Sequence, residues 1–402
     1  MQNLNKFSEL PEYAFPRLRA LLDGVKGGDV ETAMHIGEPK HPFPDFVTNQ
    51  IIKHANSFNS YPSNDGVPYL LCAIAEWIRK RYDVDSVDPE SQIISLNGTR
   101  EGLFNAAIAL GHKSKNGSVP AVLIPNPFYQ CYMVAAKAIG AEPIFTPADS
   151  TNGYLPDFQN LPKSVLSRTA LCYVCSPSNP QGAIADESYW TRLLDLAETY
   201  DFYILSDECY SEIYRDKKPP GSIQFLKKKS SDPERLLVFN SLSKRSNLPG
   251  LRSGFAVGGR NVIASLKKLK SYSGAPSPTA VQFAAAEAWR DEAHVEQNRE
   301  LYRKKVNIAD QILGETKGYR APEAGFFIWL PVNNDEKTAK ALWNKFGIKV
   351  LPGSYLSQEN YHTFTKRNPG RDYIRIALVA TESQITKGLK SISAYLNTPQ
   401  LL

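Results

Sequence analysis

The sequence predicts an α/β fold, with a mostly parallel central sheet in a large domain and a smaller α+β domain after it. Between residues 92 and 258, short apolar runs alternate with segments whose apolar residues recur at helical spacing, which is typical of βαβ units. From residue 319 onwards, three apolar runs (GFFIWLPV, IKVLPG and YIRIALVA) follow without long helical crossovers, and an amphipathic segment closes the chain at 384–396. The length of 402 residues suggests two or three domains.

We place the domain boundaries after residues 40 and 288. Residues 1–40 are expected to form an arm that contains a short helix and joins the small domain. Residues 41–288 are expected to form the large domain, and residues 289–402 the small one. The arm ends in the irregular stretch HIGEPKHPFP, where Gly37 would let the backbone approach a ligand closely. An ordinary turn glycine is the alternative.

Composition argues against several classes of protein. The net charge of +6 is spread along the chain, and its one dense basic run, at residues 227–229, is typical of a solvated loop rather than a nucleic-acid-binding patch. The N-terminal residues lack an apolar signal core, and no stretch reaches membrane-spanning length, so we expect a cytoplasmic protein. Cys172 and Cys175 lie three apart on a predicted strand and point to opposite faces, so we expect no metal site there.

The first elements of the large domain suggest a phosphate-binding junction. Tyr61 stands in a polar turn before a helix over residues 70–78, either near a ligand or simply packed. Gly98, Thr99 and Arg100 then lie between a strand at 92–96 and the next helix. Because N–H groups at a helix N-terminus bind anions, a phosphate cup is expected there. A tight turn between strand and helix is the alternative.

The middle strands end in polar loops. Strands are predicted at 121–125, 142–145 and 169–175. Tyr129, which precedes a helix, is suited to stacking on an aromatic cofactor, although packing would also explain it. Asn179 precedes Pro180 and is therefore held extended, with its amide free to donate.

A carboxylate follows the next strand. A helix at 189–200 precedes a strand at 202–205, and the chain continues as SDECYSEIY. Asp207 at the end of an apolar strand is costly unless its charge is paired. A protonated pyridine nitrogen would be such a partner, and Tyr210 would reach the phenolic oxygen of the same ring. A structural ion pair is the alternative.

The stretch NSLSKRSNLPGLRSGF, at 240–255, follows a buried strand at 236–239. Such polar loops at strand ends are where open α/β sheets bind ligands. Lys244 has two cationic neighbours in sequence, Arg245 and Arg252, and like charges together with partial burial lower the pKa of a lysine. Ser241, Ser243 and Arg252 are suited to holding a phosphate. A nucleophilic amine beside a phosphate site is what pyridoxal phosphate (PLP) requires, and a solvated basic loop is the alternative.

Arg375 interrupts an apolar run at residues 373–379. An unpaired guanidinium inside a buried strand is unfavourable, and a substrate carboxylate would satisfy it through two hydrogen bonds. A buried salt bridge within the protein is the alternative.

The order of these motifs resembles that of the fold-type I, class I/II aminotransferases. The resemblance covers nearly the whole chain and rests on IGEP, YPxxxG, NGTRE, PNPFYQ, SPSNPQG, SDECY, SLSKRxNLPGLRSG and YIRIA. It implies an aspartate aminotransferase-like fold, PLP as the cofactor, amino-acid and 2-oxo-acid substrates, and a homodimer with shared active sites.

The resemblance also implies a role for each residue. Lys244 would bind the cofactor covalently and shuttle the proton, Asp207 would pair with the pyridinium, and Asn179 and Tyr210 would donate to the ring oxygen. Tyr129 would stack on the ring, and Tyr61 would reach the phosphate of the neighbouring subunit. The phosphate would be held by Gly98, Thr99, Arg100, Ser241, Ser243 and Arg252, and the substrate carboxylate by Gly37, Asn179 and Arg375.

The longer motifs are similar to those of aminotransferases that act on N-succinyl-LL-diaminopimelate in the succinylase branch of lysine biosynthesis. Glutamate and 2-oxoglutarate would then be the amino donor and its product, and N-succinyl-2-amino-6-oxopimelate the acceptor. The sequence departs from that pattern at Gln181, where threonine is usual, and at Ser273, where histidine is expected near the site. The alternatives are an aspartate, aromatic or LL-diaminopimelate aminotransferase, a PLP-dependent C–S β-lyase and a regulatory module of the same fold.

Overall fold

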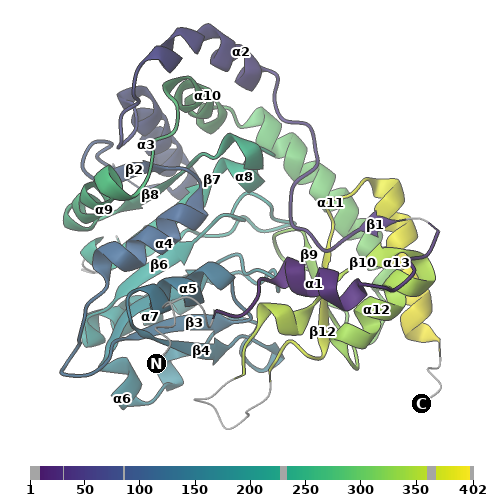
Figure 1. Cartoon of the computed structure of the whole chain (residues 1–402). Coiled ribbons are helices and arrows are strands. Elements are labelled where there is room, and N and C mark those ends of the chain that lie inside the picture. Colours follow the sequence, from purple (N-terminus) through teal and green to yellow (C-terminus); the bar gives the residue numbers. More distant parts are fainter. Residues whose placement is uncertain (1–9, 30, 85–86, 227–232, 360–367, 399–402) are drawn as a thin grey trace.

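The computed structural model describes residues 10–29, 31–84, 87–226, 233–359 and 368–398 (Figure 1). The basic run at 227–229 and the start of the predicted arm, residues 1–9, lie outside the described residues.

The large sheet has the strand order β2-β8-β7-β6-β5-β3-β4 within the described residues. Its strands are β2 (Ile93–Leu96), β3 (Ala121–Asn126), β4 (Glu142–Pro147), β5 (Thr169–Cys175), β6 (Tyr203–Asp207), β7 (Leu236–Ser241) and β8 (Gly254–Gly258). All are parallel except β8, which runs antiparallel to both β2 and β7. The mostly parallel α/β fold predicted from the alternating pattern is confirmed.

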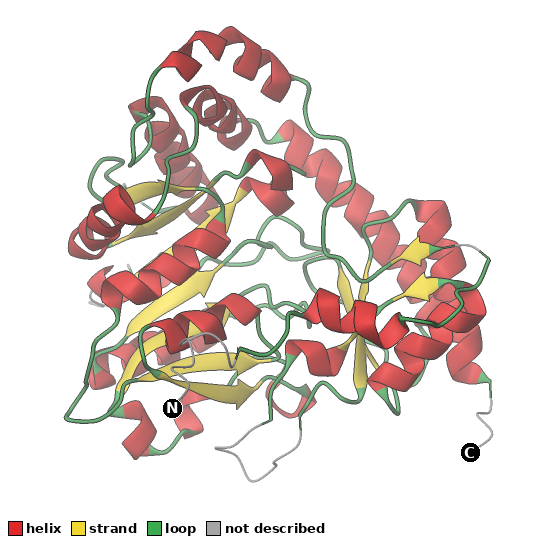
Figure 2. Ribbon diagram, in the orientation of Figure 1, coloured by secondary structure: helices red, strands yellow, loops and turns green. Residues whose placement is uncertain are grey.

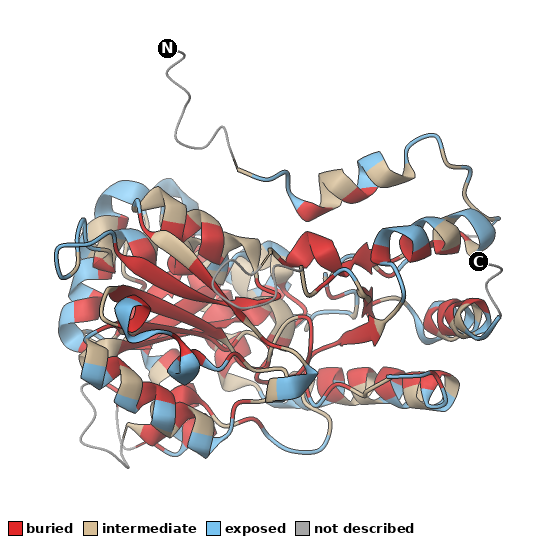
Figure 3. Ribbon diagram, turned by 90° about the horizontal axis from the view of Figure 1, so that it is seen from below, coloured by how far each residue is buried: buried red, intermediate tan, exposed pale blue. Residues whose placement is uncertain are grey.

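Helices cover both faces of this sheet, as Figure 2 shows. One face packs against α4 (Thr99–Leu110), α5 (Gln130–Ala138) and α9 (Arg260–Ser273). The other packs against α3 (Pro68–Tyr82), α7 (Glu187–Tyr200) and α10 (Thr279–Arg290), with α2 (Phe46–Lys53) outside α10. Strand side chains alternate between the two cores, as period 2 requires, and Figure 3 shows the strands as the most continuously buried part of the chain.

Smaller sheets lie beyond the carboxyl ends of the central strands (Figure 1). One is antiparallel, with β12 (Tyr373–Ala377) between β11 (Leu351–Pro352) and β9 (Phe327–Pro331). In the other, β1 (Thr32–Ala33) of the arm runs parallel to β10 (Ile348–Lys349). The helices of this region are α1 (Ala14–Leu22), α11 (Ala293–Leu313), α12 (Asp335–Phe346) and α13 (Glu382–Asn397). The exact boundaries at residues 40 and 288 stay a prediction.

Short helical segments complete the chain. They are α6 (Lys163–Leu166), α8 (Leu242–Arg245), η1 (Ala55–Asn59), η2 (Ser150–Asn152), η3 (Phe158–Asn160), η4 (Ser222–Phe225), η5 (Pro233–Arg235), η6 (Pro249–Leu251) and η7 (Gly353–Leu356). The loop predicted after β7 therefore begins with a helical turn, α8. The Ser241 hydroxyl accepts a hydrogen bond from the Ser243 N–H at 3.0 Å and caps that turn.

The sequence predicts neither a membrane-spanning segment nor a metal site at the cysteines. None of the described helices combines the length and the apolar character that crossing a bilayer requires. The described residues also contain no group of three or more His, Cys, Asp and Glu side chains arranged to hold a metal ion. Cys172 packs into the core on the α7 side of the sheet, whereas Cys175 packs toward the smaller sheets.

Candidate active site

A cavity of about 430 Å³ opens at the carboxyl ends of β5, β6 and β7. Parallel strands of open α/β sheets place ligands at this edge, so its position agrees with the fold. The arm and the smaller sheets close it from the other side, through residues such as Ile36, Phe327 and Leu351. The predicted site residues that line it are Gly37, Thr99, Arg100, Tyr129, Asn179, Asp207, Tyr210, Ser241, Ser243, Lys244, Arg252 and Arg375.

Lys244 lies partly buried on α8, and its ammonium donates a hydrogen bond to the Gly37 carbonyl at 2.5 Å. Burial lowers the pKa of Lys244 to about 8, and the charge of Arg375 adds to that effect. The prediction that Arg245 and Arg252 would lower this pKa was wrong. The Arg245 side chain is buried on the other side of the turn and pairs with Glu292 at 2.6 Å, and Arg252 is not among the main causes.

Asp207 is buried at the end of β6 without a cationic partner. Its Oδ2 accepts a hydrogen bond from the Tyr132 hydroxyl at 2.7 Å, and its Oδ1 accepts one from the Cys209 N–H at 3.3 Å. No lysine, arginine or histidine in the described ranges forms an ion pair with it, so the alternative of a structural ion pair is wrong. Burial raises the pKa of Asp207, which shows that its negative charge lacks full compensation.

Arg375 on β12 is likewise buried without a carboxylate. Its guanidinium donates to the His35 carbonyl at 2.9 Å and to the Asn179 side-chain oxygen at 3.3 Å, and it lies 4.3 Å from the centre of the Phe327 ring. The Nε has no hydrogen-bond partner within the described chain. Burial lowers the pKa of Arg375 to about 10. The alternative of a protein salt bridge is therefore wrong within the described residues, and a bound carboxylate would supply the missing acceptors.

Several of the groups that the sequence suggests for phosphate binding lie near the start of α4. Gly98 precedes this helix with φ of 84°, and a Cβ there would collide with the Arg252 guanidinium. The two guanidinium nitrogens of Arg252 donate to the carbonyls of Asn97 and Pro249, both at 2.8 Å. The Ser241 and Ser243 hydroxyls lie 2.9 Å apart, and the Ser241 hydroxyl also donates to the Ser253 carbonyl, next to Arg252, at 3.1 Å. Hydroxyls, a guanidinium and a helix N-terminus are together suited to a phosphate.

The remaining predicted side chains form the walls of the cavity. The Tyr210 ring is buried and packs edge-on against Phe326 and Phe327. Tyr129 precedes α5 and accepts a hydrogen bond from the Arg100 guanidinium, which holds its ring in place. Asn179 is followed by a cis peptide bond to Pro180.

Four residues singled out from the sequence do not line the cavity. Gly98 packs against the Arg252 guanidinium, and Tyr61 is fully exposed. Gln181 is buried, and its side chain donates to the Ala148 carbonyl at 3.0 Å. Ser273, expected near the site, is exposed at the end of α9.

Sequence reasoning also missed several wall residues. Tyr132 holds Asp207, and its spacing of three from Tyr129 could have placed both tyrosines on one side of the helix start. Phe327, Tyr13 and Phe15 come from distant parts of the chain and carried no local signal.

The comparison with protein families identifies the family of the chain. The family model described as aminotransferase class I and II matches residues 32–392. The chain belongs to this family. Aminotransferases of this class transfer amino groups between amino acids and 2-oxo acids and depend on PLP. The regulatory module is therefore set aside.

Relatives of this aminotransferase can be aligned with nearly the whole length of the chain. It is 32% identical to an LL-diaminopimelate aminotransferase of Halothermothrix orenii over 402 residues, which are 98% of each chain. A solved aminotransferase of Neisseria meningitidis is 38% identical with a TM-score of 0.92, covering 98% of this chain and all of the other. A probable N-succinyldiaminopimelate aminotransferase of Thermus thermophilus shares the fold, with a TM-score of 0.82 and 24% identity over 95% of this chain and 100% of that one.

The cavity of this aminotransferase fits PLP. An uncompensated buried carboxylate (Asp207) would meet the pyridinium, a lysine of lowered pKa (Lys244) would meet the aldehyde, and the hydroxyl and guanidinium groups beside α4 would meet the phosphate. These groups surround one cavity of about 430 Å³, within the range of cofactor sites.

Proposed function

We propose that this PLP-dependent aminotransferase moves an amino group between glutamate and N-succinyl-2-amino-6-oxopimelate, forming 2-oxoglutarate and N-succinyl-LL-diaminopimelate in lysine biosynthesis. The observation that carries the proposal is Arg375, a buried guanidinium that pairs with no carboxylate of the described residues and lies in the same cavity as Lys244. Every substrate and product of this reaction carries an α-carboxylate for it to bind. The long motifs IGEPKHP, SDECYSEIY and SLSKRSNLPGLRSGF support the choice of substrate.

Bound PLP supplies an electron sink that acidifies the substrate Cα–H. Lys244 would hold the cofactor and then, with a pKa near 8, take the proton from the substrate Cα on its Nζ. Arg375, with Gly37 and Asn179, would bind the α-carboxylate and so fix which Cα–H bond faces Lys244.

The other residues would orient the cofactor. The Asp207 carboxylate would stabilise a protonated ring nitrogen, and Tyr210 and Asn179 would donate hydrogen bonds to the ring oxygen. The Tyr129 ring would stack on the cofactor. The phosphate would be held by Gly98, Thr99, Arg100, Ser241, Ser243 and Arg252.

The homodimer with shared sites is part of this proposal. Tyr61 is fully exposed and lies outside the cavity of its own subunit. The role of Tyr61 in the site of a second copy is supported by the resemblance of its motif, YPxxxG, to that of the family. Sedimentation of the purified enzyme, together with the cofactor affinity of Tyr61→Phe, would test it.

LL-diaminopimelate is the second candidate substrate. The relative from Halothermothrix orenii has that name. Glu38 also lines the cavity, and a carboxylate there would attract the distal ammonium of LL-diaminopimelate. The N-succinyl substrate has an amide and a further carboxylate at that end instead.

A half-reaction distinguishes these candidates. The purified enzyme with PLP is mixed separately with N-succinyl-LL-diaminopimelate, LL-diaminopimelate, glutamate, aspartate and an aromatic amino acid, and the absorbance of the bound cofactor is followed. Rapid change with the succinylated substrate and glutamate supports the proposal. Rapid change only with LL-diaminopimelate, aspartate or the aromatic amino acid overturns the substrate and keeps the family.

Two controls complete this experiment. Release of pyruvate from cystathionine would identify a C–S β-lyase instead of an aminotransferase. Lys244→Ala should fold normally but lose the absorbance of lysine-bound cofactor and nearly all turnover. Turnover of Lys244→Ala at the wild-type rate would overturn the role of this lysine.

A further inference from the structure

The turn that carries Lys244 is too short to be stable by itself. α8 has four residues, and an isolated helix of that length does not form in water. Both of its ends must therefore be satisfied from outside. At the first end the Ser241 hydroxyl accepts from the Ser243 N–H. At the second end the backbone carbonyls of Lys244 and Arg245 need donors.

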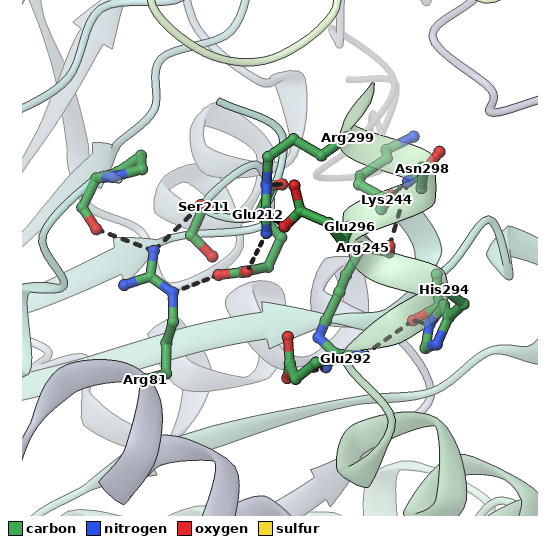
Figure 4. A network of polar contacts seen from close by, with 12 residues as sticks. Arg81, Ser211, Glu212, Lys244, Arg245, Glu292, His294, Glu296, Asn298 and Arg299 are labelled. Atoms are coloured by element: carbon green, nitrogen blue, oxygen red, sulfur yellow. Dashed lines mark hydrogen bonds and ion pairs between the residues drawn. The ribbon is translucent and has the colours of Figure 1, made fainter. Parts of the chain in front are cut away.

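Asn298 on α11 supplies that donor from 54 residues further along the chain. Its side-chain nitrogen donates to the Lys244 carbonyl and to the Arg245 carbonyl, both at 3.2 Å, and the side chain is buried. Figure 4 shows Asn298 pointing from α11 at this end of the turn. Asn298 thus acts as the cap of α8.

The orientation of the Asn298 amide is set by two further residues. The Lys305 ammonium lies 2.6 Å from Nε2 of His41, and Nδ1 of His41 lies 2.9 Å from the Asn298 side-chain oxygen. An ammonium only donates, so Nε2 must accept and the neutral ring carries its proton on Nδ1. Nδ1–H then donates to the Asn298 oxygen and leaves the Asn298 nitrogen for the two carbonyls.

The protonation states of His41 and Lys305 agree with hydrogen bonds that are donated from Lys305 through His41 to Asn298. Burial is the main cause that lowers the pKa of His41 below its usual value, which keeps the ring neutral at pH 7. Burial lowers the pKa of Lys305 to about 8, so most of it stays charged at pH 7 and able to donate. Lys305 also donates to the Val379 carbonyl at 3.4 Å, which anchors the start of the chain of hydrogen bonds.

The arm contacts Lys244 from the other side as well. The Gly37 carbonyl, four residues before His41, accepts the hydrogen bond from the Lys244 ammonium at 2.5 Å. One short segment, residues 37–41, therefore holds both the amine of Lys244 and, through Asn298, its backbone.

We propose that Lys305, His41 and Asn298 form a directed chain of hydrogen bonds that positions Lys244 for its chemistry. This inference rests on the proposed role of Lys244. The three are positioning residues, because none of them lines the cavity. They would fix the position of the Lys244 amine relative to the cofactor and the substrate Cα. A displacement of a reacting group by about 1 Å can lower the rate about 100-fold.

The test compares Asn298→Ala, Lys305→Met and Lys305→Arg in the holoenzyme, with Asn307→Ala as a matched control. Asn307 lies on the same helix, is exposed and forms no side-chain hydrogen bond or ion pair in the described ranges. The readouts are the pH titration of cofactor absorbance, the circular dichroism of the bound cofactor, and kcat and KM for glutamate.

We expect Asn298→Ala to shift the absorbance titration by about half a pH unit or more and to lower kcat by about 10- to 100-fold. The KM for glutamate should change less than about threefold, since Arg375 is untouched. Lys305→Met should move the same readouts less, Lys305→Arg should restore them, and Asn307→Ala should match the wild type.

Other outcomes overturn the inference. If Asn298→Ala and Lys305→Met lower only the thermal midpoint and leave titration, dichroism and kcat unchanged, the chain is structural. If Asn298→Ala does not fold, Lys305→Met decides, because it leaves the contact with α8 in place. Failure of the proposed function shows separately, as Lys244→Ala retaining cofactor absorbance and turnover.

Discussion

Lys244 and Arg245 are neighbours on one helical turn, yet their side chains enter two different regions. The regions differ in whether their buried charged groups have ionic partners. On the cavity side, Asp207 and Arg375 have no ionic partner within the described residues. On the other side, Glu212 accepts hydrogen bonds from Arg81 at 2.5 Å and Arg299 at 3.3 Å, and Arg245 pairs with Glu292 (Figure 4).

Asp207 and Glu212 show the difference most directly. Burial raises the pKa of both. At Glu212 the charges of Arg81, Arg245 and Arg299 outweigh burial, so its pKa lies below the usual value. At Asp207 burial prevails, and its pKa lies above the usual value. Of these two carboxyls, the one without a cationic partner lines the cavity, whereas the one paired with arginines lies outside it.

The largest expected contrast is between Asp207→Asn and Glu212→Gln. Asp207→Asn removes a charge aimed at the cofactor, so kcat/KM should fall by about 10³-fold while the thermal midpoint stays the same or rises. Glu212→Gln leaves two buried arginines without a full partner and should lower the free energy of unfolding by about 3–5 kcal/mol. Steady-state kinetics per bound cofactor and urea unfolding measure both. Loss of stability in Asp207→Asn would contradict the comparison.

Arg375→Met and Arg81→Met make the same comparison with cations. Arg375→Met should reduce kcat/KM for glutamate by about 100-fold, mainly through KM, because a charge-assisted carboxylate contact is lost. It should not lower stability, since no carboxylate of the described protein loses its partner. Arg81→Met should destabilise the fold and leave kcat/KM of the folded enzyme unchanged. Substrate saturation curves and thermal melts, measured on both variants, check this.

The pH dependence of cofactor capture sharpens the comparison further. Only the unprotonated amine attacks the aldehyde, so with a pKa of about 8 the capture rate of the apoprotein should rise about tenfold from pH 6 to pH 7 and level off above pH 8. Because the charge of Arg375 lowers this pKa, Arg375→Met should move the midpoint to higher pH. Stopped-flow absorbance after mixing with PLP follows the rate. A midpoint near pH 10 would show that the surroundings of Lys244 do not lower its pKa.

Tyr132→Phe should give the smallest effect. The Tyr132 hydroxyl donates to Asp207 and favours its charged form, so its removal should raise the pKa of Asp207 and reduce kcat/KM about fivefold. Tyr173→Phe is the control, because Tyr173 stacks on Tyr132 but donates to the Leu103 carbonyl instead. Equal losses in both variants would mean that packing, not the hydrogen bond, is being measured.

Local patterns explain what the sequence predicts well. The strands that end at Asp207 and before Ser241 are apolar runs, and the junction at Gly98 is marked by a glycine before a helical stripe. Such signals lie within a few residues of one another, so the elements and most cavity residues can be placed without the structure. The expected uncompensated charges of Asp207 and Arg375 follow from the same local argument.

Features that depend on distant contacts could not be predicted. Nothing near Arg245 in the sequence shows that it turns away from Lys244 toward Glu292. The sequence therefore predicts the effect of burial on the lysine pKa correctly but assigns the effect of charge to the wrong arginines. The stretch after β7 looks like a loop because the cap that closes α8 comes from Asn298.

The cap on α8 has a consequence for how the enzyme is made. Lys305 and His41 lie 264 positions apart, and Asn298 is synthesised long after Lys244. A nascent chain that has emerged only as far as α10 would carry all the strands of the large sheet but no closed turn around its lysine. Contacts between distant segments form late because their loop closure must first be overcome. We therefore expect the chain to capture the cofactor only after translation has passed α11, when the arm and α11 have come together around the lysine.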